Sequence, residues 1–103
     1  FQTAAMLGIT VCAAAGDNGS ADGEHDGKVH VDFPASSPFV LGCGGTTLTT
    51  KDKKPVSEIV WHNADGGATG GGISEYFPTP DYQQKINVPV SLNNNFAGRG
   101  VPD

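Results

Sequence analysis

Apolar residues are gathered in short runs that alternate with stretches rich in glycine and polar side chains. Residues 9–15 form an apolar run without alternation, and residues 39–43 repeat this character after a long polar stretch. Continuous apolar runs of this length are typical of strands buried on both faces of a parallel sheet. The pattern therefore predicts two buried strands, joined by a long loop over residues 18–37.

The segments around these runs have weaker signals. Residues 1–8 are typical of the last turns of a helix that ends at Gly8. Residues 46–50 and 56–61 are rich in Thr, Val and Ile and flank a polar turn, which predicts a β-hairpin. A short helix is expected between residues 80 and 86. Strands and helices together place the chain in the α/β class.

The composition limits how much of a domain this chain can form. Of its 103 residues only 22 are Leu, Ile, Val or Phe, so any core is thin. A doubly buried parallel sheet needs helices on both faces, and the pattern offers one helix end and one short helix. We therefore expect residues 1–103 to be an internal part of a single, larger α/β domain.

Charge excludes some functions and leaves others open. Six basic residues stand against eleven acidic ones, which argues against a nucleic-acid partner. The sequence contains neither an apolar run near the ~20 residues of a membrane span nor a recognisable signal peptide. Residues 17–32 alone carry a net charge of −4, from five acidic side chains and Lys28. A solvated loop, a cation site and an acidic binding surface all fit this block.

The candidate metal ligands and the two cysteines add little to the functional interpretation. Asp22-Gly-Glu-His-Asp-Gly27 is similar to the start of a calcium loop, but Phe33 stands where the closing glutamate belongs, so no metal is expected in this chain. Cys12 and Cys43 lie in the two apolar runs and form no CxxC pair. Two buried free thiols are expected, while a disulfide stays open because the two runs can be neighbours.

Several motifs resemble one known family. Gly8-Ile-Thr-Val-Cys-Ala-Ala-Ala-Gly-Asp-Asn-Gly19 resembles a strand and loop of the sedolisins, the serine-carboxyl peptidases, with the kumamolisin branch most similar. The likeness continues, in order, through residues 30–40, 42–47, 58–61, 68–74, 77–80 and 98–103. It covers nearly the whole chain with unrelated motifs, and is therefore far more specific than a single glycine-rich string.

The resemblance implies a subtilisin-like fold, with a mostly parallel sheet flanked by helices, and an acid-active, secreted endopeptidase that cleaves proteins or peptides. Family members use a serine nucleophile, a glutamate base with an aspartate behind it, and a second aspartate in the oxyanion hole, which Asp17 matches. The family's GTS-type serine motif is absent, since Gly45-Thr-Thr47 carries threonine there. We expect the Glu/Asp pair before residue 1 and the serine and calcium site after residue 103. The chain alone is then inactive.

The chemistry of Asp17 can be stated independently of the resemblance. A developing oxyanion is stabilised by a positioned donor, and a carboxyl donates only while it holds its proton. Acid pH and partial burial both favour that form. Asp32 precedes a segment expected near the substrate cleft, where a carboxylate can attract basic substrate residues.

Two alternative functions remain. One is a non-catalytic secreted module that binds cations through the acidic loop. The other is a true subtilisin, in which asparagine is expected at the position of Asp17. Residues outside the chain distinguish the first alternative from a peptidase.

Overall fold

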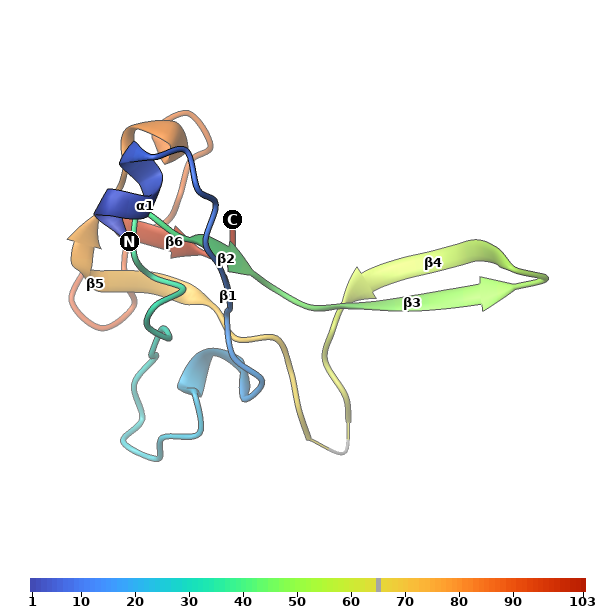
Figure 1. The fold of residues 1–103 in the computed structure, drawn as a ribbon. Coiled ribbons are helices and arrows are strands. Elements are labelled where there is room, and N and C mark those ends of the chain that lie inside the picture. Colours follow the sequence, from blue (N-terminus) through green and yellow to red (C-terminus); the bar gives the residue numbers. More distant parts are fainter. Residues whose placement is uncertain (65) are drawn as a thin grey trace.

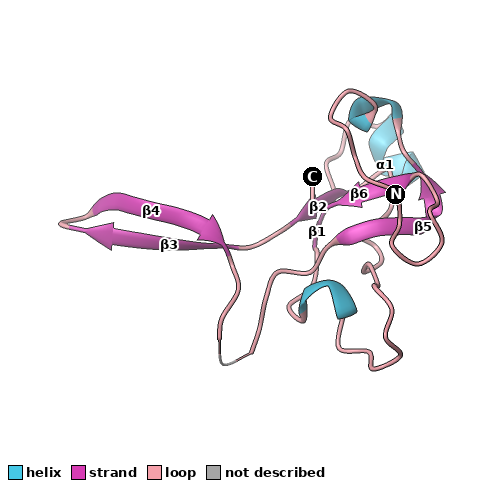
Figure 2. Ribbon diagram, turned by 180° about the vertical axis from the view of Figure 1, so that it is seen from behind, coloured by secondary structure: helices cyan, strands magenta, loops and turns pink. Residues whose placement is uncertain are grey.

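The computed structural model describes residues 1–64 and 66–103. Within them, the strands pair into three small two-stranded sheets (Figure 1). Strand β1 (Cys12–Ala14) pairs in parallel with β2 (Leu41–Cys43). Strand β3 (Thr46–Lys51) pairs antiparallel with β4 (Lys54–Val60). Strand β5 (Gly72–Pro78) pairs antiparallel with β6 (Gly98–Val101). The helical elements are α1 (Gln2–Met6) and the 3₁₀ turns η1 (Gly19–Ala21) and η2 (Asp81–Gln83). Loops join these short elements over much of the molecule (Figure 2).

The N-terminal helix and the first strand follow the predicted order but are shorter. Helix α1 is followed by Gly8 at φ 71°, a left-handed conformation that glycine adopts without strain. The Ile9 N–H still donates to Ala4 O, at 2.9 Å. This bond to the helix engages Ile9, and the parallel pairing begins only at Cys12.

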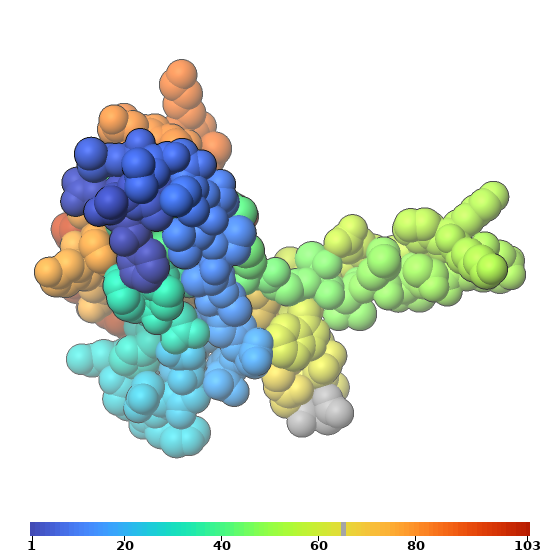
Figure 3. Space-filling view, viewed as in Figure 1, coloured from blue at the N-terminus to red at the C-terminus, as the bar shows by residue number. Residues whose placement is uncertain are grey.

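The predicted hairpin is confirmed and forms an arm that projects from the body (Figure 3). Its turn is tighter than the expected polar segment, because the strands reach Lys51 and Lys54 and leave only Asp52 and Lys53 between them. Both turn residues have positive φ, 51° and 61°, as two-residue type I′ hairpin turns require. Every residue from 46 to 60 is exposed.

The pair β5–β6 is a strand pairing that the sequence pattern missed. Strand β6 contains Gly98 and Gly100, and glycine is depleted in strands. Gly98 is needed for close packing here, because a Cβ at this position would lie 1.7 Å from Ser74 O. The expected helix after Pro80 is reduced to the 3₁₀ turn η2.

The apolar core of the described residues is small. Its buried apolar members are Ala15, Ala35, Val40 and Val101. Large apolar side chains such as Met6 and Leu92 are 81% and 85% exposed. The radius of gyration is 15.0 Å, against about 13 Å for a compact domain of this length. The chain therefore leaves much apolar surface uncovered by its own residues.

The prediction that β1 and β2 are buried on both faces is wrong for this structure. Cys12 and Cys43 are free and exposed, which also corrects the expected burial of both thiols. Helices that would cover such a pair are lacking among the described residues, and α1 is only five residues long. Cys12 pairs with Leu41 and Cys43 with Ala14. The cysteines are thus diagonal neighbours, about 7–8 Å apart, a separation too wide for an unstrained disulfide.

In the described part of the chain, no helix is long and apolar enough to cross a bilayer.

Candidate active site at the end of strand β1

The loop that follows β1 is held on both sides by backbone hydrogen bonds. On one side, the Ala15 N–H donates to Cys43 O at 2.8 Å, which extends the pairing with β2. On the other side, Gly70 N–H donates to Gly16 O at 2.7 Å and Ala68 N–H donates to Asp17 O at 2.9 Å. Asp17 therefore lies at the carboxyl end of a parallel strand, with its backbone fixed between two neighbouring segments. Ligand sites of open α/β sheets gather at this edge.

Glycines allow the backbones to approach each other here. A Cβ at Gly70 would lie 1.8 Å from Ala15 O, so only glycine fits between β1 and residues 68–70. Gly16 has φ 101°, and a Cβ there would lie 2.6 Å from Asp32 Oδ2. Gly70 thus serves a close backbone contact with the end of β1.

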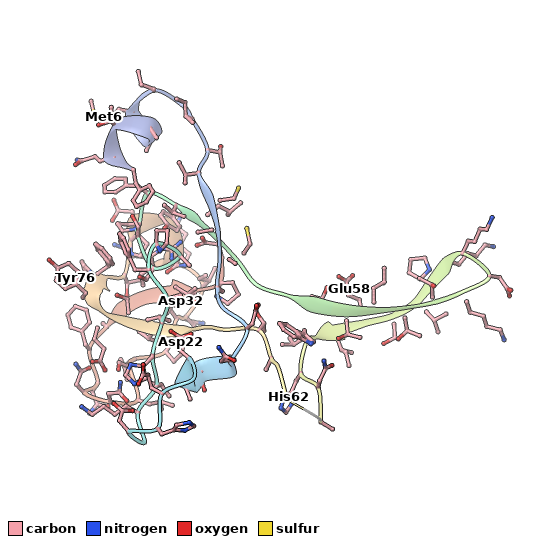
Figure 4. All side chains as sticks on the ribbon, turned by 60° about the horizontal axis from the view of Figure 1, so that its bottom comes forward. Met6, Asp22, Asp32, Glu58, His62 and Tyr76 are labelled. Atoms are coloured by element: carbon pink, nitrogen blue, oxygen red, sulfur yellow. The ribbon has the colours of Figure 1, made fainter. Side chains whose placement is uncertain are left out.

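The carboxyl groups of Asp22 and Asp32 lie together beside Gly16 (Figure 4), and the charge of Asp17 acts on Asp32; we call Asp17, Asp22 and Asp32 the acidic group. Asp32 Oδ2 and Asp22 Oδ1 both lie close to the position that a Gly16 side chain would take. Partial burial raises the pKa of Asp32, as do its hydrogen bond with Asp22 and the negative charges of Asp22 and Asp17. The structure thus brings the predicted residues Asp17 and Asp32 to one place, although 14 residues separate them in the sequence.

Sequence reasoning treated Asp22 only as part of a calcium-like motif and missed its contact with Asp32. Asp17 itself is exposed in the described chain, so its own burial does not favour the protonated form here. Asp32 is partly buried. Asp32 therefore has the more sheltered carboxyl, and Asp17 is open to an approaching molecule.

Asp32 is expected to destabilise the folded protein as the pH rises above about 4. Its pKa is raised from 3.8 in the folded state, so in that window the folded state keeps a proton that the unfolded state has released. The contribution of Asp32 to stability is full below the unfolded pKa and is lost as the pH rises through the folded pKa. Asp32→Asn should therefore raise the melting temperature relative to wild type by an amount that grows from about pH 3 to about pH 7.

Thermal unfolding of the two proteins, followed by circular dichroism across that range, measures this difference. Glu24→Gln is a suitable control, because it removes an exposed carboxylate from the same loop. A melting-temperature difference for Asp32→Asn that stays constant with pH contradicts the effect.

The second half of the acidic loop is organised by a different pair. His30 Nε2 lies 3.0 Å from Asp26 Oδ1. The hydrogen bond with Asp26 raises the pKa of His30, and the same bond lowers the pKa of Asp26. Asp22 and Asp26, which a calcium loop would point at one ion, thus contact different partners, Asp32 and His30. The described residues contain no group of three or more His, Cys, Asp or Glu side chains placed to hold a metal. Among the described residues, the calcium-like motif of residues 22–27 therefore does not direct its side chains at one ion.

A distant segment anchors the loop near His30. The Val29 N–H donates to Asn93 Oδ1 at 3.1 Å, and Asn93 Nδ2 donates to Val29 O at 2.8 Å. The neighbouring Ser91 hydroxyl donates to Glu75 Oε1 at 2.8 Å. Hydrogen bonds from Ser91 and Asn93 lower the pKa of Glu75. The acidic loop is therefore tied to the β5–β6 side of the molecule.

Comparisons with known proteins decide the family. No protein-family model matches the chain. The chain is 57% identical over 105 residues to kumamolisin of Bacillus sp. (strain MN-32), a match that covers 100% of the chain and 19% of kumamolisin. It is also 34% identical over 119 residues to tripeptidyl-peptidase sed5 of Aspergillus fumigatus, covering 100% of the chain and 20% of that protein. The chain belongs to the sedolisin family, in its kumamolisin-like branch.

A solved structure agrees with this assignment. Pseudomonas sedolisin, a serine-carboxyl proteinase complexed with two molecules of pseudo-iodotyrostatin, superposes with a TM-score of 0.80 at 35% sequence identity, covering 99% of this chain and 29% of the sedolisin chain. The likeness to a sedolisin confirms the expected subtilisin-like α/β class. The flanking helices and the mostly parallel sheet stay predictions. The chain spans about a fifth of the length of the curated sedolisin relatives it matches.

Proposed function

We propose that this sedolisin chain is an internal part of the catalytic domain of an acid-active, secreted serine-carboxyl endopeptidase, and that Asp17 is its oxyanion-hole donor. The protein or peptide substrate would lie across the carboxyl end of β1. The serine nucleophile and the Glu/Asp pair that the family uses would come from other segments of the same domain. Any calcium site of the complete enzyme would also lie in those segments.

The chemistry assigned to Asp17 follows from its position and its proton. Attack on a peptide carbonyl builds negative charge on the carbonyl oxygen, and a donor already in place stabilises this charge without reorganisation. A protonated Asp17 carboxyl offers one O–H donor, whereas an ionised one offers none and repels the oxyanion. Asp17 is exposed, so a bound substrate would contact it directly and exclude water from it.

One observation carries the proposal. Asp17 follows a parallel strand in a chain that is 57% identical to kumamolisin, and hydrogen bonds from residues 68–70 hold its loop. The uncovered apolar surface of the described residues also supports the view that further segments of a domain pack onto this chain.

The acidic group supports a role for Asp32 in binding basic substrate residues. Its carboxyl lies next to Gly16 and therefore beside the proposed site of acyl transfer. Because the pKa of Asp32 is raised, its attraction for a cation would be weak in strong acid and would grow as the pH rises through that pKa.

Asp32→Ala is expected to lower the preference of the full-length enzyme for a Lys or Arg side chain near the cut site about two- to fivefold. This factor corresponds to ~0.4–1 kcal/mol, the interaction energy of a partly exposed charge pair. The measurement compares kcat/KM for two peptides that differ only in Arg against citrulline. A variant that retains the full preference for Arg refutes the role of Asp32.

Hydrolysis of a denatured protein by the full-length protein at acid pH tests the proposed function itself. We expect cleavage by the full-length protein and none by a polypeptide of residues 1–103, which holds one of the four expected catalytic residues. An inactive full-length protein, or an active isolated chain, contradicts the proposal.

A further inference from the structure

Arg99 on β6 is fully buried and uses its guanidinium group within the protein. Its Nη1 donates to Ala35 O, its Nη2 donates to Val40 O at 2.9 Å, and its Nε donates to the Tyr82 hydroxyl at 2.9 Å. The same Nη2 forms an ion pair with Asp103 Oδ2, at 2.5 Å. A buried arginine with this many partners fixes the position of each of them, because every displaced partner leaves a buried donor unpaired.

The partners of Arg99 are held in turn by a second set of bonds. Asp103 Oδ2 also accepts from Gly42 N at 2.7 Å, and its Oδ1 accepts from Gln83 Nε2 at 3.1 Å. Gln83 is buried and exchanges two hydrogen bonds with the backbone of Gly100, both 2.9 Å long. Among the described residues, every buried side-chain nitrogen or oxygen has a partner. A fully satisfied network of this kind specifies a single arrangement.

This network acts on the segment that begins at Asp32. Residues 32–40 contain no helix or strand, so few regular backbone bonds hold them. Arg99 donates to the Ala35 carbonyl inside the segment and to the Val40 carbonyl at its end. The Tyr82 hydroxyl donates to the Pro38 carbonyl between them, at 3.3 Å.

The segment reaches the acidic group through one short turn. The Ser36 N–H, next to the carbonyl that Arg99 holds, donates to Asp32 O at 2.9 Å. Ala35 is 0% exposed and Ser36 is buried, so this turn has little room to move. The carboxyl of Asp32 then lies against Gly16 with no space for a side chain between them. A shift of the turn would therefore move the Asp32 carboxyl relative to Gly16 and Asp17.

We propose that Arg99 is a positioning residue for substrate recognition: by holding the Ala35 and Val40 carbonyls, it sets the place of Asp32 beside Gly16 and so the preference for a basic substrate side chain. This inference rests on the proposed function. Arg99 does not touch the substrate; it acts through the backbone of residues 33–36. Tyr82 assists, because its hydroxyl links Arg99 to the same segment at Pro38.

The test uses the full-length enzyme and two peptides that differ only in Arg against citrulline near the cut site. The quantity measured is the ratio of their kcat/KM values, in wild type and in three variants, Arg99→Lys, Tyr82→Phe and Asp32→Asn. Tyr76→Phe is the matched control, because Tyr76 is 83% exposed and lies outside the network. We expect Arg99→Lys and Tyr82→Phe to lower the ratio about two- to fivefold, toward that of Asp32→Asn, with kcat for the citrulline peptide within about twofold of wild type.

Tyr82→Phe keeps the test informative if Arg99→Lys does not fold, because it removes one hydroxyl and retains the ring. Two results would overturn the inference. The first is a wild-type kcat/KM ratio in a folded Arg99→Lys or Tyr82→Phe enzyme while Asp32→Asn lowers that ratio. The second is an equal loss of activity on both peptides in the Arg99 or Tyr82 variant, which indicates a structural role alone. A wild-type enzyme that cleaves both peptides equally well also overturns it. Absence of any cleavage by wild type instead contradicts the proposed function.

Discussion

Asp17→Ala in the full-length enzyme is expected to reduce kcat about 10²–10³-fold at acid pH, the usual loss when one oxyanion donor is removed. The reason is that, in the role we propose for Asp17, alanine would leave the developing oxyanion without an O–H donor at the end of β1. The loss should fall on kcat rather than KM, because this hydrogen bond is made mainly in the transition state. Steady-state kinetics on a single peptide substrate measures both.

Asp81→Ala provides the matched control, since Asp81 is an exposed aspartate on η2 whose side chain contacts Gln84. We expect that control to keep wild-type kinetics. A kcat for Asp17→Ala within about threefold of wild type would remove Asp17 from the oxyanion hole.

Gly70→Ala is expected to destabilise the protein by about 3 kcal/mol or more and to lower kcat/KM about 10²-fold. A methyl group at Gly70 would lie 1.8 Å from Ala15 O, a clash with backbone that no side-chain rotation relieves. Residues 68–70 would have to move away from the end of β1, and the hydrogen bonds to Gly16 O and Asp17 O would be lost with them. Denaturant unfolding and peptide hydrolysis measure the two effects.

Gly45→Ala is the corresponding control for a glycine of ordinary φ. Its added methyl group would meet the edge of the Trp61 ring at 3.2 Å, a side chain that can shift by a few tenths of an ångström. We expect a much smaller loss of stability there. Equal effects of the two substitutions would show that the close contact of Gly70 with β1 has no special importance.

The sequence predicted those elements whose signals are local. Helix termination at Gly8, the β3–β4 hairpin and the parallel partners β1 and β2 all follow from short-range patterns that the structure retains. Strand β6 was not predicted because glycine has a low β-propensity. Gly98 is present for its close contact with Ser74, which strand propensities do not reveal. The predicted burial of Cys12 and Cys43 was wrong. The apolar pattern is typical of strands covered by helices, and the described residues do not supply those helices.

The candidate site was predictable in part. Asp17 stood out because it ends an apolar run between glycines, and Asp32 because a resemblance and its charge pointed to it. The contact of Asp32 with Asp22 depends on how the loop folds over Gly16, which no spacing in the sequence encodes. The sequence analysis included Arg99 only within the family-like residues 98–103 and did not predict its burial. Arginine is usually exposed, and the burial of Arg99 depends on acceptors 59 and 64 residues away in the sequence.

The pH dependence of Asp17→Asn tests the central claim most directly. An asparagine at this position keeps an N–H donor at every pH, whereas the aspartate donates only while protonated. We therefore predict that, in the full-length enzyme, kcat declines less steeply between about pH 4 and about pH 7 in Asp17→Asn than in wild type. Superimposable profiles with equal kcat would contradict the assignment of Asp17 as the protonated oxyanion donor.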